Sequence, residues 1–349
     1  MFVLVYLQGE YDQLLRKKIF CLLLCMFCAF SACSCADTEM QNVHTKEMYA
    51  LDTIITITAY GDKAPNAIEA AEREILRLEK LFSVTDAESD ISRINSADGG
   101  TVTVSEETAE LILRSKEISS GCFGAFDISI YPLVSLWGFT KNEYSVPNSA
   151  DLQSALKLVD FSKIDVKGTA VTLPRGMSID LGGVAKGYIS EKTADVLKEN
   201  GVESAVISLG GNIYTVGIRA DKKEWAIGLK NPDGEGNLAV INCEETAIIT
   251  SGGYQRYFTE NGKKYHHILS PSSGCPAESG IKSSTVISTD STLADALSTA
   301  FYVLGAEKSV QLAEKFGVDF VFVTDDGKVL LSDGIADRFT LLDDSYEIG

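Results

Sequence analysis

Residues 177–188 read M-S-I-D-L-G-G-V-A-K-G-Y, and this stretch restricts the possible folds more than any other. The apolar residues Met177–Leu181 predict a short strand, and a helix is expected to begin near Ala185. Three glycines, which lack a Cβ and so permit close backbone approach, follow this strand: Gly182, Gly183 and Gly187. A helix N-terminus behind such a turn suits a phosphate, because it offers free N–H groups and a partial positive charge. Lys186 adds a mobile cation.

The spacing of this turn matches neither of the two common phosphate loops. A P-loop requires G-x-x-x-x-G-K-[ST], but here Lys186 precedes Gly187 and a tyrosine follows. The dinucleotide fingerprint G-x-G-x-x-G is also unmatched. From these residues alone, a plain structural turn and a phosphate site both remain open.

The net charge of the chain limits its possible partners. A formal charge of −18 over 349 residues argues against nucleic-acid binding, which demands a basic surface. The same charge makes an anionic cofactor hard to hold without a metal ion or local backbone dipoles. The apolar content of 45% is that of an ordinary globular protein.

The N-terminus predicts export and a lipid anchor. A basic cluster precedes the apolar run at 19–30, which is too short to span a bilayer and is typical of a secretory signal. The run ends in F-S-A-C, which resembles a bacterial lipobox with Cys33 as the lipid-bearing residue. We therefore expect a lipoprotein signal peptide at 1–32, a tether at 33–46 and a lipid-anchored, extracytoplasmic protein at the cell membrane, in a periplasm or on an outer face. Simple cleavage and release is the alternative.

The remaining chain predicts one α+β domain at 47–340, with a mostly antiparallel sheet packed with helices and a tail at 341–349. Hairpins are common, and strands and helices do not alternate strictly, which disfavours a doubly wound fold. Trp225–Leu229 and Leu238–Ile241 are expected to extend the sheet. Glycine turns end three predicted strands, at 182–183, 210–212 and 251–253. These turns suggest one shared edge where the backbone meets a ligand.

Residues 121–139 are rich in aromatic side chains around one carboxylate, Asp127. One interpretation is a buried strand with a capping aspartate. The other is a flat aromatic ligand held near Phe126, with Asp127 accepting hydrogen bonds from the edge of its ring.

The predicted helix Ser291–Leu304 carries one charge between Ser291 and Val303, the carboxylate of Asp295. Both faces of this helix are therefore expected to be covered, and a buried carboxylate is costly unless it is paired or bound to a metal. Asp295 and Thr299, one turn apart, offer oxygen ligands for a hard cation such as Mg²⁺. Capping of a neighbouring backbone segment is the alternative.

The chain holds three histidines, His44, His266 and His267, a number that argues against a zinc site built from histidines. Cys122, Cys243 and Cys275 in the folded part have no zinc spacing and make no disulfide framework. His266 and His267 follow a strong Asn261-Gly262 hairpin signal. Adjacent strand residues point to opposite faces, so at most one of these two histidines faces a site.

Five ordered motifs together resemble the ApbE family of flavin transferases: G-A-F-D (124–127), D-L-G-G-V-A-K-G-Y (180–188), S-L-G-G-N (208–212), H-H-I-L-S-P (266–271) and A-D-A-L-S-T-A (294–300). The resemblance implies a T-fold-like architecture in a single bilobed domain that binds FAD and Mg²⁺. It also implies transfer of FMN from FAD to a threonine hydroxyl of an acceptor protein, with release of AMP. The implied acceptors are flavoproteins of membrane or extracytoplasmic electron transfer.

The resemblance further implies roles for individual residues. The metal would be held by the backbone carbonyl of Ala185 and by Asp295 and Thr299, and His267 would assist the transfer. The implied flavin-binding residues are Ala125, Phe126, Asp127, Gly182, Lys186, Tyr188 and Ile268. The chain departs from the family pattern at Leu51 and Ser270, and Ser298 stands where some relatives carry a second aspartate.

Two other activities share the same implied site. An Mg²⁺-dependent FAD pyrophosphatase would use water in place of the threonine, and a flavin-binding lipoprotein would perform no chemistry. All three activities would require a cation, because the negatively charged diphosphate of FAD is repelled by a strongly acidic protein unless a metal ion offsets that charge.

Overall fold

The computed structural model describes residues 42–349, so the predicted signal peptide at 1–32 lies outside the described residues. Its centre is a nine-stranded sheet in the order β1-β2-β6-β7-β10-β13-β14-β15-β17. The strands are β1 (Val43–Ala50), β2 (Thr53–Tyr60), β6 (Ala205–Leu209), β7 (Asn212–Val216), β10 (Ala247–Gly252), β13 (Ile281–Ser288), β14 (Asp319–Thr324), β15 (Lys328–Leu331) and β17 (Glu347–Ile348). Neighbours pair antiparallel except β15 and β17. The predicted α+β class with a mostly antiparallel sheet is confirmed.

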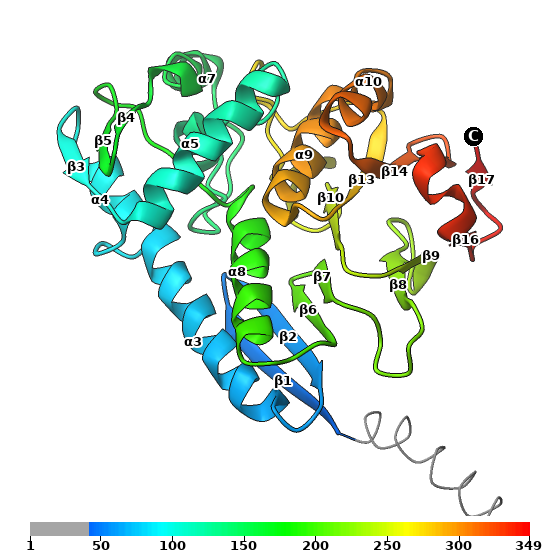
Figure 1. The fold of residues 1–349 in the computed structure, drawn as a ribbon. Helices are drawn as coiled ribbons and strands as arrows, with labels where there is room; N and C mark the ends of the chain where they lie inside the picture. The colour runs from blue at the N-terminus through cyan, green and yellow to red at the C-terminus, as the bar shows by residue number, and fades with distance from the viewer. Residues whose placement is uncertain (1–41) are drawn as a thin grey trace, which may run out of the picture.

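Helices cover one face of this sheet (Figure 1). They are α3 (Ala64–Phe82), α8 (Ala185–Glu199), α9 (Ser291–Leu304) and α10 (Ala306–Phe316). In α3 the buried residues Ala71, Ile75 and Leu78 recur at three and four positions, which is the spacing of one helical face. The main apolar core fills the space between this helix layer and the sheet.

A second, three-stranded sheet covers the other face of the central sheet. It consists of β16 (Phe339–Leu341), β9 (Asn237–Cys243) and β8 (Trp225–Lys230), in that order. Our expectation that the strands at 225–229 and 238–241 extend the main sheet was wrong. The central strands are apolar on both faces, as β14 shows with four consecutive buried residues, so their second face requires a cover.

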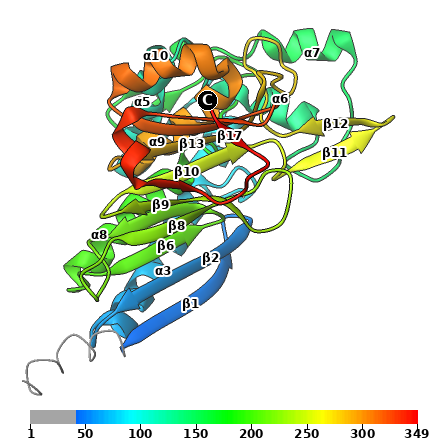
Figure 2. The same ribbon diagram turned by 90° about the vertical axis from the view of Figure 1, so that its right-hand side faces the viewer.

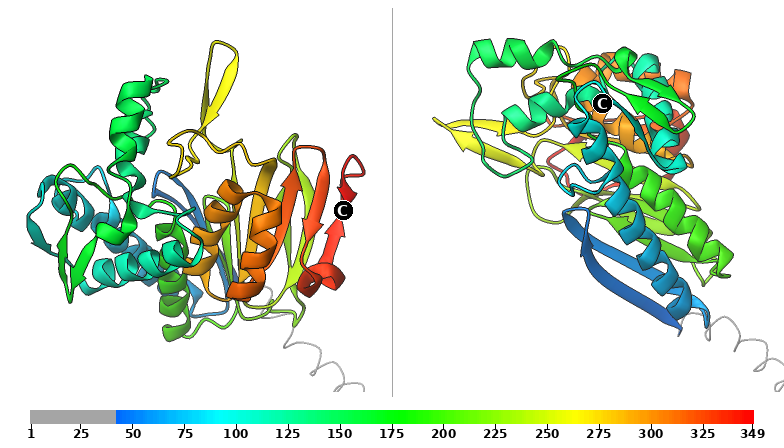
Figure 3. Two further views of the ribbon diagram at one scale, coloured as in Figure 1. Left: turned by 90° about the horizontal axis from the view of Figure 1, so that it is seen from above. Right: turned by 90° about the vertical axis from the view of Figure 1, so that its left-hand side faces the viewer.

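The segment between α3 and α8 lies beside the sheet (Figure 3). Its elements are α4 (Asp90–Ser96), β3 (Thr101–Thr103), α5 (Glu106–Gly121), η1 (Ile128–Ile130), α6 (Tyr131–Leu136), α7 (Ser149–Leu156), η2 (Phe161–Lys163), β4 (Asp165–Lys167) and β5 (Ala170–Thr172). The strand considered within 121–139 is absent there, because Asp127 caps a helical turn and Pro132 lies in the first turn of α6. Proline fits a first helical turn and cannot donate to a strand ladder.

A hairpin of β11 (Tyr257–Glu260) and β12 (Lys263–His266) projects from the body of the molecule, on the same side as the β1–β2 turn (Figure 2). Its predicted turn is confirmed, since Asn261 and Gly262 both have positive φ. Phe258 fixes the hairpin by stacking on Tyr144 and Tyr265, with ring centroids 5.2 Å and 5.3 Å apart.

Both predicted end segments reach into the fold. β1 begins at Val43, so the tether predicted at 33–46 extends too far; the rest of it, up to residue 41, lies outside the described residues. The tail predicted at 341–349 contains β17, which pairs with β15, and the buried Tyr346. Within residues 42–349, no helix combines the length and apolar character needed to cross a membrane.

Candidate functional site

The segment before α8, Met177–Leu181, belongs to none of the sheets, contrary to the predicted strand. The side chain of Asn95 replaces a strand partner for Ile179. Its Oδ1 accepts from the Ile179 N–H (2.7 Å), and its Nδ2 donates to the Ile179 carbonyl (2.9 Å). One residue on, Asp180 Oδ1 accepts from the N–H of Gly182 (2.8 Å). The glycine turn is therefore held by hydrogen bonds from side chains, and not by the backbone hydrogen bonds of a strand ladder.

Two cations stand near the carboxylate of Asp180. Burial raises the pKa of Asp180, while the Gly182 N–H and the charges of Lys186 and Arg256 act in the opposite direction. Lys186 Nζ lies 3.5 Å from the Gly182 carbonyl, so its ammonium folds back over the turn. The first turn of α8 therefore combines a helix N-terminus with a positively charged side chain, as an anion site requires.

Asp295 of α9 is 3% exposed and faces the first turn of α8. Its Oδ2 accepts from the backbone N–H of Gly187 (2.8 Å), and its Oδ1 accepts from Asn212 Nδ2 (2.9 Å). Lys186 Nζ is 4.0 Å from Oδ1. The predicted burial of this carboxylate is confirmed, and each of its oxygens keeps a further lone pair for a cation.

Three hydroxyl groups lie beside Asp295. Ser251 Oγ, at the end of β10, is 2.8 Å from Ser298 Oγ and 3.3 Å from Thr299 Oγ1. Ser298 Oγ also donates to the backbone carbonyl of Asp295 (2.8 Å). The α9 face that carries the predicted metal ligands is therefore polar and internally hydrogen-bonded.

Two of the three predicted metal ligands, Asp295 and Thr299, lie close to the start of α8. A Cβ built on Gly183 would lie 3.8 Å from Thr299 Oγ1, and one built on Gly187 would lie 2.8 Å from Asp295 Cβ. Ala185 stands between these two glycines in the chain. Within residues 42–349, no group of three or more His, Cys, Asp or Glu side chains could hold a metal. A carboxylate, a hydroxyl and a carbonyl oxygen fit a hard cation such as Mg²⁺, which commonly combines few protein ligands with substrate phosphates.

Phe126 of the predicted flavin site lies against the same turn. Its Cε2 would be 3.1 Å from a Cβ on Gly183, so a side chain there would force the ring to shift by a few tenths of an ångström. Ala125 is buried beside it. Asp127 Oδ1 accepts from the N–H and the hydroxyl of Ser129 (2.8 Å and 2.6 Å), and its Oδ2 accepts from the Phe161 N–H (3.1 Å).

These bonds show Asp127 as a capping residue, and its predicted contact with a flavin edge stays a prediction. Burial raises the pKa of this carboxyl, and the hydrogen bonds from Ser129 oppose the rise.

Tyr188 does not join the site residues around Asp295. Its ring is buried against Phe82 of α3, with centroids 5.7 Å apart. Burial raises the pKa of its hydroxyl, and the nearby carboxylates of Glu110 and Glu107 raise it further. The reason is helical geometry: Gly187 faces α9, and the next residue is turned by about 100° into the layer of α3 and α5.

His267 directly follows β12. Its Nδ1 is 3.0 Å from the backbone carbonyl of Arg256, and its own N–H donates to the same oxygen (3.1 Å). Burial lowers the pKa of His267 to about 4, and the charges of Arg256 and Lys186 contribute in the same direction.

The neighbours of His267 face elsewhere. His266 Nε2 is 3.0 Å from the Ala277 carbonyl, and its ring meets Tyr302 edge-on with centroids 5.4 Å apart. The prediction that at most one of the two histidines faces the site agrees with these separate surroundings. Ile268 is buried in the main core.

Motif spacing missed three residues that shape the site: Asp180, Asn212 and Ser251. The glycine turns were the sequence signal that could have pointed to these residues, because each of them lies in or beside a predicted strand-to-glycine turn. Asn212 contacts Asp295, and Ser251 contacts Thr299, so the turns at 210–212 and 251–253 both meet α9. The turn at 182–183 follows a segment outside the sheets, and contact of the three turns with a ligand stays a prediction. Which side chain in each turn reaches the site was not readable from spacing.

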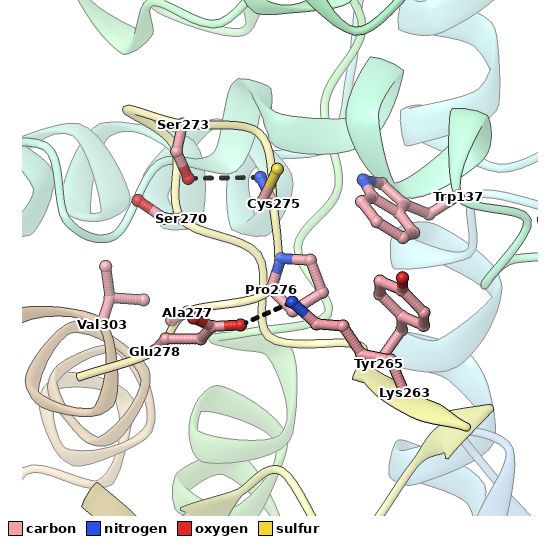
Figure 4. A pocket seen from close by; sticks show the side chains of 10 residues that line it. All are labelled: Trp137, Lys263, Tyr265, Ser270, Ser273, Cys275, Pro276, Ala277, Glu278 and Val303. Carbon is pink, nitrogen blue, oxygen red and sulfur yellow. Dashed lines mark hydrogen bonds and ion pairs between the residues drawn. The ribbon is translucent and has the colours of Figure 1, made fainter. Parts of the chain in front are cut away.

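A cavity of about 470 Å³ lies beside the β11–β12 hairpin (Figure 4). Trp137, Tyr265 and Cys275 line it, and the ion pair of Lys263 and Glu278 (3.0 Å) closes one side. None of the predicted site residues lines this cavity. The candidate site is therefore identified by its polar side chains, and the cavity is a separate feature.

Comparisons with known proteins give consistent matches. The model of the ApbE family matches residues 51–322. The chain is 39% identical to an FAD:protein FMN transferase of Klebsiella pneumoniae (strain 342), over 78% of this chain and 87% of that protein. It is 31% identical to an FAD:protein FMN transferase of Treponema pallidum (strain Nichols), over 92% of this chain and 95% of that protein.

Solved structures agree with this match. The ApbE protein of Thermotoga maritima superposes with a TM-score of 0.79 at 34% identity, covering 84% of this chain and 98% of that one. The apo form of the Pseudomonas stutzeri flavinyl transferase ApbE gives a TM-score of 0.74 at 28% identity, covering 82% and 92%. The expected ApbE-like architecture is confirmed.

Proposed function

The chain belongs to the ApbE family and is an FAD:protein FMN transferase, and from this premise we propose a Mg²⁺-dependent reaction in which a threonine hydroxyl of the acceptor protein receives FMN. The threonine oxygen attacks the phosphorus of the FMN half of FAD. The bond from that phosphorus to the bridging oxygen breaks, and AMP leaves with the electron pair. The hydroxyl proton passes to a base, because an alcohol is a poor nucleophile near neutral pH.

The contact between His267 Nδ1 and the Arg256 carbonyl is the observation that carries this proposal. The Arg256 carbonyl can only accept, so the 3.0 Å contact requires the proton on His267 Nδ1. Nε2 then keeps an unprotonated lone pair. A pKa lowered to about 4 means that this lone pair is free at neutral pH. His267 is therefore set up to take the threonine proton, a role worth roughly 10²–10⁴-fold in rate.

The start of α8 is suited to the diphosphate of FAD. Its helix N-terminus and Lys186 supply positive charge on a strongly acidic protein. Asp295, Thr299 and the Ala185 carbonyl would hold Mg²⁺ there. Such an ion would supply positive charge to offset the charge that develops on the diphosphate as AMP leaves. Phe126, packed against Gly183, lies next to this turn and would contact the flavin ring.

Product analysis tests the proposal. The purified protein is incubated with FAD, Mg²⁺ and an acceptor protein that carries a target threonine. Acceptor-bound flavin fluorescence that survives SDS supports the transferase, whereas free FMN and AMP without labelling would indicate a pyrophosphatase. Unchanged FAD would indicate a binding protein and would overturn the proposal.

The paired histidines provide a matched control. We expect His267→Gln to lose about 10²–10⁴-fold in transfer rate. His266→Gln removes the neighbouring imidazole, which bonds to Ala277 on another side, and should retain most activity. Equal losses in both variants would contradict the assignment of His267 as the base.

We also propose that the protein is anchored through a lipid on Cys33 and modifies membrane or extracytoplasmic flavoproteins of electron transfer. The F-S-A-C stretch after the apolar run supports this, although it precedes the residues that the structure describes. A Cys33→Ser variant should move from the membrane fraction to the soluble fraction. Unchanged membrane association in that variant would contradict the anchor.

A further inference from the structure

We propose that Ser251 is a positioning residue, which orients the hydroxyl of Thr299 so that its lone pairs face the divalent cation. This inference rests on the metal assignment made above and extends it to a residue outside the ligand set. It concerns the direction of a short chain of hydrogen bonds that links β10 to α9.

The chain has four members in contact. Thr299 Oγ1 is 3.3 Å from Ser251 Oγ, which is 2.8 Å from Ser298 Oγ, which in turn is 2.8 Å from the backbone oxygen of Asp295. Ser298 is completely buried, so solvent does not compete for its hydroxyl. Each hydroxyl has one proton to donate and two lone pairs with which to accept.

The carbonyl at the end of the chain determines the direction of every bond in it. A carbonyl oxygen only accepts, so Ser298 must use its single proton on the Asp295 oxygen. The bond between Ser298 and Ser251 then requires the proton of Ser251. Ser251 has no proton left, and the bond between Ser251 and Thr299 therefore requires the proton of Thr299.

This direction matters for a metal ligand. A hydroxyl binds a cation through a lone pair, and a proton pointing toward the cation would repel it. With its proton committed to Ser251, Thr299 Oγ1 keeps its lone pairs free for a cation. The glycine turn before α8 is close to this oxygen, since a Cβ built on Gly183 would lie 3.8 Å from it. Ser251 thus selects the rotamer of the hydroxyl that a cation needs.

Metal binding measures this effect directly. Mn²⁺, a paramagnetic substitute for Mg²⁺, is titrated into the full protein, and the free ion is counted by electron paramagnetic resonance. Residues that orient metal ligands typically change metal affinity 10–100-fold, and we expect a loss of that size in Ser251→Ala. Ser298→Ala should lose less Mn²⁺ affinity. In that variant the Ser251 hydroxyl can still accept the proton of Thr299, but it is no longer forced to, because its own proton is not committed to Ser298.

A neighbouring hydroxyl pair supplies the control. Thr250, the residue before Ser251 on β10, contacts Thr285 through hydroxyls 2.8 Å apart. Thr250→Val removes a hydroxyl of the same strand outside the proposed chain. Its Mn²⁺ affinity should stay within about twofold of the original protein.

A double-mutant cycle separates orientation from general damage. In a Thr299→Val background there is no hydroxyl to orient, so adding Ser251→Ala should change the affinity no further. A full additional loss, or an unchanged affinity in Ser251→Ala alone, overturns the positioning role. If Thr299→Val and Asp295→Ala both bind Mn²⁺ normally, the metal assignment itself is wrong. Thermal melts of each variant verify folding.

Discussion

The close contact of α8 and α9 at Gly187 makes a single methyl group a sharp probe of the site. In Gly187→Ala the new Cβ would lie 2.3 Å from the Ser291 carbonyl oxygen and 2.8 Å from Asp295 Cβ. Real Cβ atoms essentially never come within 3.0 Å of such an atom, so the helices must separate by at least 0.7 Å at this point. Ser291 O belongs to the backbone and cannot rotate away.

This separation of the two helices would weaken the hydrogen bond that joins α8 to Asp295. The hydrogen bond from Gly187 N–H to Asp295 Oδ2 starts at 2.8 Å, and a shift of this size takes it near the limit of a real hydrogen bond. Overpacking costs about 1–3 kcal/mol, and alanine returns roughly 1 kcal/mol in helix propensity. A displacement of about 1 Å at a catalytic group can cost roughly 10²-fold in rate. We therefore expect a modest loss of stability and a large loss of transfer activity.

Urea unfolding and the kcat/KM of FMN transfer measure the two effects. Ser190→Ala on the same helix is the matched control, since Ser190 is buried and its hydroxyl has no hydrogen-bond partner among the described residues. That variant should keep its activity and lose no stability. Original activity and stability in Gly187→Ala would refute the argument that α8 must approach α9 this closely.

Four further predictions follow from individual residues. If His267 is the base, kcat/KM should stay level down to about pH 5 and fall with an apparent pKa near 4; a limb near 6.5 in the pH profile would contradict its depressed pKa. The same depressed pKa contributes stability that is fully present above pH 6.5 and is lost as pH falls toward 4, because the unfolded chain binds a proton that the folded chain does not. Urea unfolding across this pH range should show a loss of roughly 3 kcal/mol relative to His267→Gln, which lacks the imidazole. Asn95→Ala removes both bonds to Ile179, so unfolding free energy should drop by about 1–3 kcal/mol, and an unchanged urea midpoint would contradict its role as a substitute strand partner. Asn212→Ala leaves Asp295 Oδ1 without a donor and should weaken Mn²⁺ binding about 10–100-fold; normal binding would show that the amide does not orient the carboxylate.

Much of the local structure could be predicted from the sequence. The start of α8 and the bounds of α9 were correct because helical periodicity and capping are local properties of the chain. Burial of Asp295 was predictable because the helix around it carries no other charge between Ser291 and Val303. The separate surroundings of His266 and His267 followed from the alternation of side chains along a strand.

Only the tertiary structure decided which of these residues meet. Gly187 and Asp295 lie 108 positions apart, and Asn212 lies 83 positions from the same carboxylate. Nothing in local periodicity distinguishes Tyr188, which turns into the helix layer, from Lys186, which reaches toward Asp295. The order of residue types along the chain determines helices, strands and turns through short-range hydrogen bonds. The site, in contrast, is assembled by close packing between elements that are distant in the sequence.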